Sequence, residues 1–163
     1  MPDLEQLEEL VPKIVEIMRS HPDVPNTFGE PGPVIWLKNF PSGSCDISSL
    51  TIASALYELG LGDWELVSAF DERGQGHTWL RLRVAGQIMM SIDATIHQFN
   101  EWDEPWVGYG DSPAAARFIH PRHEYRLTTV PSWWPRGHEL EVATWTREKI
   151  RDLGTVAPDA AQT

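Results

Sequence analysis

The chain has 163 residues, of which 41% are hydrophobic and 23% charged, as expected for one globular domain with its own hydrophobic core. Its formal net charge of −11 argues against partners that present rows of phosphates, both nucleic acids and anionic membranes. No apolar run approaches the roughly 20 residues that span a bilayer, and the acidic N-terminus lacks the apolar core of a signal peptide. The single cysteine allows no internal disulfide, so we expect a cytoplasmic protein.

Helical spacing of apolar residues is clearest near the two ends of the chain. Residues 3–20 combine an apolar face with an acidic one, and Pro12 inside the pattern predicts a kink or two short helices. Residues 140–153 predict a closing helix that ends at Gly154. We expect residues 156–163 to be a disordered tail, which leaves residues 1–155 as one domain.

The only cysteine lies in the stretch FPSGSCDISSLTIASALY, residues 40–57. A Pro-Ser-Gly turn precedes Cys45, and an apolar run predicts a buried helix from about residue 46 to residue 59. Ser44 or Asp46 is expected to cap this helix. The free N–H groups and the dipole of a helix start favour a negative charge, so we expect them to lower the pKa of the Cys45 thiol.

Strand patterns follow the cysteine helix. Residues 77–84 alternate clearly between polar and apolar, residues 64–70 do so in part, and residues 88–94 are the next strand-like run. Short turns separate the three, which predicts an antiparallel meander with the cysteine helix on one face. Further on, we expect a short helix at residues 114–119 and a strand at residues 124–130. Loops are expected at residues 21–33, 109–111 and 131–137. The predicted fold class is α+β.

Cys45, His77 and Asp93 are the candidate catalytic residues. Cysteine catalysis requires a thiolate, an imidazole that relays the proton and a polar group that orients the imidazole. His77 opens the second strand of the meander and Asp93 lies near the end of the third. If these strands pair through the turn at residues 85–86, His77 lies opposite Asp93, with Cβ atoms roughly 4.5–5.5 Å apart. Taken singly, each residue has an ordinary structural explanation: a buried cysteine, a surface histidine and a turn aspartate.

These residues belong to a set of short motifs: a Phe-Pro-x-Gly turn before the cysteine, then His-x-Trp-Leu, then Ile-Asp-x-Thr followed by Gln-Phe. The matching positions are Phe40, Pro41, Gly43, Cys45, His77, Trp79, Leu80, Ile92, Asp93, Thr95, Gln98 and Phe99. Over about residues 36–100 the set resembles the papain-like, transglutaminase-like cysteine enzymes of bacteria. It is most similar to the group that includes the glutamine deamidase domain of multifunctional bacterial toxins.

The resemblance implies a papain-like core, with Cys45 as nucleophile, His77 as general base and acid, and Asp93 as the residue that orients His77. Papain-like proteases carry an oxyanion-hole amide six residues before the cysteine, a position that Asn39 occupies here; a turn-forming asparagine is the alternative. We expect Trp79, Gln98 and Trp102 to contact the substrate. Core packing remains an alternative for the tryptophans, of which the chain has eight.

The expected activity is acyl transfer from an amide or thioester carbonyl through an acyl-thioester on Cys45. Water as acceptor makes the enzyme a deamidase, amidase or peptidase, whereas an amine makes it a transglutaminase-like acyltransferase, for example in a biosynthetic pathway. The substrate is then a protein, a peptide or a small molecule, no cofactor is required, and the oligomeric state is open. The alternative is a catalytically silent papain-like scaffold that binds proteins through its Trp-rich segments.

A metal site is a weaker interpretation of the histidines. His77, Asp93, His97 and either His120 or His123 are the residues that would supply it. They fall on predicted strands and loops rather than on one helical face with HExxH spacing, so we expect no metal. His138 is expected to be a surface residue.

Overall fold

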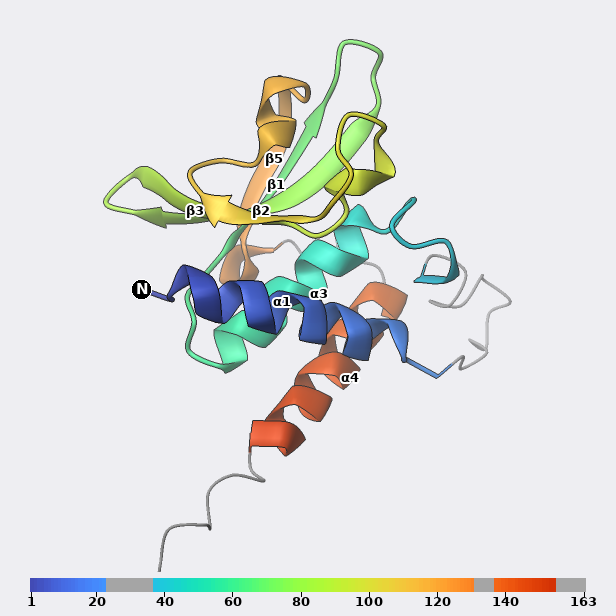
Figure 1. Ribbon diagram of the computed structural model, residues 1–163, viewed down its shortest axis with the longest axis vertical. Helices are drawn as coiled ribbons and strands as arrows, with labels where there is room; N and C mark the ends of the chain where they lie inside the picture. The colour runs from blue at the N-terminus through green and yellow to red at the C-terminus, as the bar shows by residue number, and fades with distance from the viewer. Residues whose placement is uncertain (23–36, 131–136, 155–163) are drawn as a thin grey trace, which may run out of the picture.

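A computed structural model describes residues 1–22, 37–130 and 137–154 of the chain (Figure 1). Over these residues the protein is α+β, with three α-helices and one five-stranded antiparallel sheet. The helices are α1 (Leu4–Arg19), α3 (Cys45–Glu58) and α4 (Gly137–Gly154). The strands are β1 (Glu65–Phe70), β2 (Gly76–Val84), β3 (Gln87–Asp93), β4 (Trp106–Tyr109) and β5 (His120–Arg126). Within this part of the chain, no helix is both long and apolar enough to cross a membrane.

The sheet has the strand order β4-β3-β2-β1-β5, so the predicted meander β1-β2-β3 forms its centre. The strands predicted at residues 64–70, 77–84 and 88–94 are therefore confirmed to within one residue at each end. Strand β5 begins earlier than the strand predicted at residues 124–130, and the 3₁₀ turn Leu127–Thr129 follows it. Strand β4 was not predicted, because its four residues follow a Pro- and Trp-rich segment with no alternation.

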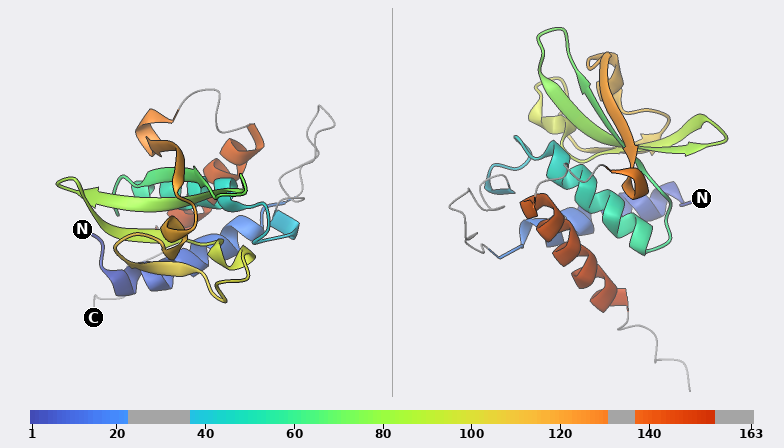
Figure 2. Two further views of the ribbon diagram at one scale, coloured as in Figure 1. Left: turned by 90° about the horizontal axis from the view of Figure 1, so that it is seen from above. Right: turned by 180° about the vertical axis from the view of Figure 1, so that it is seen from behind.

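Helix α3 is the centre of the core. Every residue from Ile47 to Leu56 is buried, since the sheet covers one side of the helix while α1 and α4 cover others. In Figure 1 the sheet lies above α3 and α1 crosses in front of it, and the rear view in Figure 2 shows α4 on the side of α3 away from the sheet. The prediction that the cysteine helix packs on one face of the meander is confirmed. The helix ends before Gly60, whose φ of 70° suits glycine.

The two terminal helices agree with their predicted ranges. Helix α1 buries Leu7, Val11, Ile14 and Met18 on the face predicted to be apolar. It runs through Pro12 as one helix rather than as two short ones. Pro12 is exposed, so the carbonyl group that its missing N–H leaves unpaired can be hydrated. Helix α4 covers the range predicted for the closing helix and begins three residues earlier.

Between β3 and β5 the chain forms two short 3₁₀ turns, Ile96–Gln98 and Pro113–Ala116, which cover the other face of the sheet, while strand β4 between them joins the edge of the sheet beside β3. The second turn replaces the short helix predicted at residues 114–119. Aromatic and small side chains fill the space beneath this segment, namely Val67, Ala69, Trp79, Ile96, Phe99, Ala114 and Phe118. Most of the predicted loop at residues 21–33, nearly all of the loop at 131–137 and the predicted tail at 156–163 lie outside the described residues.

Candidate functional site

His77 and Asp93 form a buried pair at one end of the sheet. His77 is near the start of β2 and Asp93 ends β3; each residue is 1% exposed. The His77 Nε2 atom lies 2.9 Å from Oδ2 and 3.0 Å from Oδ1 of Asp93. Because an ionised carboxylate only accepts hydrogen bonds, Nε2 carries a proton and donates it to this pair of oxygens.

The register that joins the pair differs from the prediction. An irregularity between Leu82 and Arg83 shifts the β2–β3 pairing by one residue, and the last paired residues are Leu80 and Ile92. If the pairing continued one residue beyond Leu80 and Ile92, Trp79 rather than His77 would lie opposite Asp93. His77 therefore reaches Asp93 diagonally on the same face of the sheet, which long and aromatic side chains can do.

Ser112 is a second donor to Asp93. Its Oγ lies 2.9 Å from Asp93 Oδ2, and its side chain also caps the 3₁₀ turn Pro113–Ala116 by accepting the Ala114 N–H at 3.1 Å. Ser112 is 2% exposed. The Asp93 carboxylate is thus held from both sides, by an imidazole on β2 and by a hydroxyl from the segment that covers the sheet.

Aromatic rings surround the imidazole of His77. Trp79 stacks on it with ring centroids 5.8 Å apart, while Phe99 meets it edge-on at 4.9 Å and Phe118 lies at 5.1 Å. Trp79 is 1% exposed, and its Nε1 donates to Asp111 at 3.0 Å. The expectation that Trp79 contacts substrate is therefore wrong for this conformation, because the indole is part of the core beneath His77.

Cys45 reaches the same end of the sheet from the side of α3. It is the first residue of that helix and is partly buried. Strand β2 stays paired with β1 as far as Gly76, whereas its pairing with β3 stops at Leu80. At the end where β2 and β3 part, the Thr78 carbonyl accepts the Ser49 Oγ–H at 3.3 Å, and the Thr78 N–H faces the Cys45 thiol.

The side chain of Thr78 adds a third link between β2 and α3. Its Oγ1 donates to Asp46 Oδ1 at 2.6 Å, one residue after Cys45. Ser44 occupies the N-cap position, but it makes no side-chain capping bond, and its Oγ donates to the Ser42 carbonyl at 3.4 Å. The start of the cysteine helix is therefore fixed by β2, at the residue next to His77, rather than by the predicted caps.

The predicted lowering of the Cys45 pKa is wrong. Burial raises the pKa of the thiol from 9.0 to about 12, and the negative charges of Asp46 and Asp93 act in the same direction. The N–H groups of Thr78 and Asp46 lower it, but by less than burial raises it. At neutral pH the free protein thus holds a neutral thiol, within electrostatic range of Asp93.

Gln98 connects the cysteine loop to the imidazole. Its Oε1 accepts the Gly43 N–H at 3.3 Å, and its Nε2 lies 3.4 Å from His77 Nδ1. With Nε2 of His77 protonated, Nδ1 of the neutral ring is an acceptor, which suits the amide donor. Gln98 was expected to contact substrate. It lies between the cysteine loop and His77, and its hydrogen-bond partners there are Gly43 and His77.

Asn39 and Trp102 lie at the edge of the site. Asn39 is exposed, and its carbonyl accepts the Ser42 N–H at 2.8 Å, which places it in the turn before Cys45. The turn geometry fits the structural alternative for Asn39 and leaves its side-chain amide in solvent. Trp102 is partly buried and packs edge-on against Phe99, with ring centroids 6.3 Å apart.

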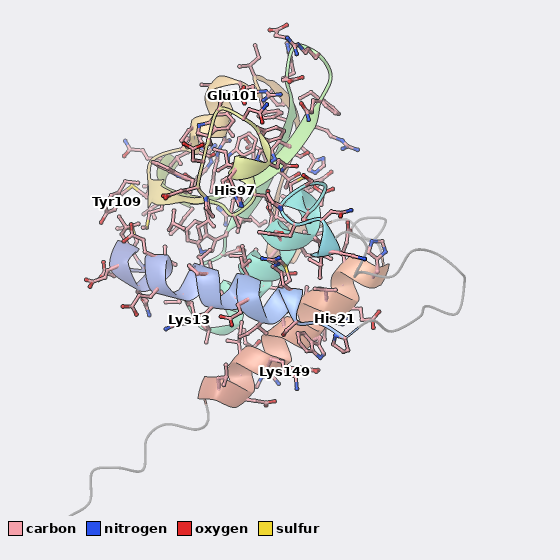
Figure 3. The ribbon with its side chains drawn as sticks, turned by 45° about the vertical axis from the view of Figure 1, so that its right-hand side comes forward. Lys13, His21, His97, Glu101, Tyr109 and Lys149 are labelled. Carbon is pink, nitrogen blue, oxygen red and sulfur yellow. The ribbon has the colours of Figure 1, made fainter. Side chains whose placement is uncertain are left out.

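The histidines do not assemble around a metal. Among the described residues there is no group of three or more His, Cys, Asp or Glu side chains that could hold a metal ion. His97 lies in the segment above α1 (Figure 3), where its ring meets Phe40 at 5.9 Å. Burial lowers the pKa of His97, and the charge of Asp93 opposes that shift.

Sequence reasoning missed three residues that build the site: Thr78, Asp111 and Ser112. Asp111 accepts both Trp79 Nε1 and Arg81 Nε, and so ties the covering segment to β2. The only local signal was the Asp-Ser-Pro sequence at residues 111–113, which is typical of the start of a helical turn. Nothing in that pattern indicates that Ser112 reaches Asp93.

Comparison with protein-family models, with curated proteins and with solved structures found no match.

Proposed function

We propose that the protein is a cysteine-dependent acyl-transfer enzyme with a papain-like core, in which Cys45, His77 and Asp93 act together. The observation that carries this proposal is the buried His77–Asp93 pair, supported by Ser112 and adjacent to the cysteine loop. Burying a carboxylate costs several kcal/mol unless it is paired, and packing alone gives no reason to bury Asp93. Such arrangements concentrate at functional sites.

The mechanism follows from the protonation states. Asp93 accepts the Nε2 proton of His77, so Nδ1 holds the lone pair that can take a proton. The Cys45 sulfur attacks the carbonyl carbon of an amide or thioester, and its proton passes to Nδ1. The C–N or C–S bond then breaks, and the imidazolium returns the proton to the leaving amine or thiol. Water or an amine attacks the resulting acyl-thioester and restores the Cys45 thiol.

The raised pKa of Cys45 defines what His77 has to do. A thiol with a pKa of about 12 is scarcely ionised at pH 7, so attack needs proton transfer to His77 as the C–S bond forms. For Nδ1 to act as the base, the Gln98 amide has to release it. Substrate that displaces this 3.4 Å contact would free Nδ1 toward the cysteine loop.

The test uses activated acyl donors, p-nitrophenyl acetate and an acetyl thioester. We expect mass spectrometry of the intact protein to show one added acetyl group, and peptide mapping to locate it on Cys45, the single cysteine of the chain. Cys45→Ala should remain folded and take up no acetyl group. Equal labelling of Cys45→Ala, or no labelling of the wild type by either donor, would remove the proposal.

A silent scaffold is the second candidate, and two observations favour it: the raised pKa of Cys45 and the burial of His77. Iodoacetamide separates the two functions. In an enzyme, alkylation of Cys45 at pH 7 should slow in His77→Ala, because the imidazole assists ionisation. In a scaffold, alkylation should follow the ionisation of an isolated high-pKa thiol and should not depend on His77.

A further inference from the structure

A second feature lies along helix α1, on the side that faces β4 and the segment after β3. It is a groove of about 820 Å³. One wall is the α1 face from Glu8 to Arg19, and the other is formed by Ala94, Glu104, Pro105 and Val107. Figure 3 shows His97 and Tyr109 above α1 on this side of the molecule. The groove is of the size that binding sites commonly have.

The floor of the groove is apolar. Val11 is 2% exposed, and Val15 and Val107 are partly buried at the contact between helix and sheet. Phe40 closes one end, where Arg19 lies over its ring at 4.9 Å from the centroid. Apolar side chains would therefore leave water on entering the groove.

The rim is acidic. Glu8 and Glu16 on α1 and Glu104 on the opposite wall are exposed, and none of them forms an ion pair with a described residue. Among the described residues that line the groove, Arg19 is the one cation, at the Phe40 end. The balance of charge along the rest of the groove is negative, which complements lysine or arginine side chains.

The groove also borders two segments that carry residues of the candidate site. Phe40 belongs to the loop that ends at Cys45, and Ala94 directly follows Asp93. At ~1.5 Å per helical residue, the α1 wall from Glu8 to Arg19 is about 16 Å long. An extended chain at ~3.3 Å per residue would place about five residues there.

From the apolar floor, the acidic rim and this length, we propose that the groove binds a short polypeptide segment with apolar side chains flanked by lysine or arginine. Binding does not require the chemistry of Cys45. If the proposed function holds as well, the groove keeps such a segment beside the acyl-transfer site.

The experiment measures binding of a fluorescein-labelled peptide, Lys-Leu-Val-Leu-Lys with an amidated C-terminus, by fluorescence polarisation at 50 mM and 200 mM salt. We expect saturable binding that weakens at the higher salt, because two charged pairs contribute. The double variant Glu8→Gln/Glu16→Gln should bind about fivefold more weakly, equivalent to about 1 kcal/mol. The matched control is Glu5→Gln/Glu9→Gln, which removes the same charge from exposed positions of α1 outside this groove and should bind as the wild type does.

Two further peptides test the chemistry of the occupant. Replacing both lysines by glutamate should abolish binding, and replacing the three apolar residues by serine should weaken it at least tenfold. Equal losses in the two double variants would show attraction to net charge alone and would overturn the proposal, as would unchanged binding of either altered peptide. Cys45→Ala should bind the Lys-containing peptide like the wild type, so a failure of acylation and a failure of peptide binding are separate results.

Discussion

Asp93→Asn tests the role of the buried pair without changing its shape. The carboxylate now accepts the His77 Nε2 proton at 2.9 Å and the Ser112 hydroxyl at 2.9 Å. An asparagine oxygen at the Oδ2 position still accepts from Ser112, and the NH₂ group then takes the Oδ1 position, 3.0 Å from Nε2. The NH₂ hydrogen repels a proton on Nε2 and so favours the tautomer with the proton on Nδ1, which removes the lone pair that would take the Cys45 proton.

The expected effects on activity and on stability differ widely. A wrong histidine tautomer costs about 10⁴ in rate where this has been isolated, so we expect acetylation of Cys45 by p-nitrophenyl acetate to slow by ~10³–10⁴. Loss of one charged hydrogen bond in the core should lower the free energy of unfolding by only about 1–3 kcal/mol. Ser112→Ala is the control, because it removes a partner of Asp93 and leaves the His77 tautomer intact; its rate should fall far less.

The assays are stopped-flow absorbance for acylation and urea unfolding followed by tryptophan fluorescence. A folded Asp93→Asn protein that acylates at the wild-type rate would refute the reasoning, because the tautomer would then have no bearing on Cys45.

Two further predictions concern the cysteine helix. Thr78→Val removes the donor to Asp46 and should lower the free energy of unfolding by about 1–2 kcal/mol. Thr51→Val is the control: the buried Oγ1 of Thr51 has no hydrogen-bond partner, so its removal should be neutral or stabilising. Equal losses of stability in urea unfolding would contradict this prediction. Because the folded thiol pKa is raised from 9.0 to about 12, the unfolded chain releases the Cys45 proton first as pH rises above 9, and the stability of the wild type should fall there. The loss should be at most ~1.4 kcal/mol per pH unit and should be absent from Cys45→Ala, so parallel stability curves for the two proteins between pH 9 and 10.5 would speak against the raised pKa.

The sequence predicted best where one short-range pattern covered a whole element. Alternation along residues 77–84 identified β2, because neighbouring side chains of a strand point to opposite faces of the sheet. The apolar run after Cys45 identified α3, because that helix is buried on all sides. Strand β4 left no such pattern, since four residues are too few for alternation to be seen. Pro12 suggested a break that α1 does not have, because the buried residues Leu7 and Ile14 on either side of it hold the helix against the core.

The sequence predicted that His77 and Asp93 lie together, but not the register that brings them together. His77 and Asp93 were paired from a plain hairpin. The turn register Val84↔Gln87 alone would set Thr78 opposite Asp93; a one-residue irregularity between Leu82 and Arg83, which residue types do not reveal, brings His77 and Asp93 to the same face as diagonal neighbours. The Cys45 pKa was predicted from the helix start alone. The opposing effects of burial, Asp46 and Asp93 depend on the depth of the thiol in the fold, and depth is a tertiary property.

The hydrogen bond from Ser112 to Asp93 also depends on tertiary structure that short sequence patterns do not record. It joins residues 19 positions apart through a segment that folds back over the sheet. Only the topology β3, 3₁₀ turn, β4 and second 3₁₀ turn brings the hydroxyl to the carboxylate.

The most direct test of the account is the rate at which Cys45 is acylated in His77→Ala compared with the wild type at pH 7. If the imidazole takes the proton of a neutral thiol, general-base assistance is lost and the rate should fall by ~10²–10⁴ while the circular dichroism spectrum is unchanged. An acylation rate within twofold of the wild type, in a folded His77→Ala protein, would contradict the account.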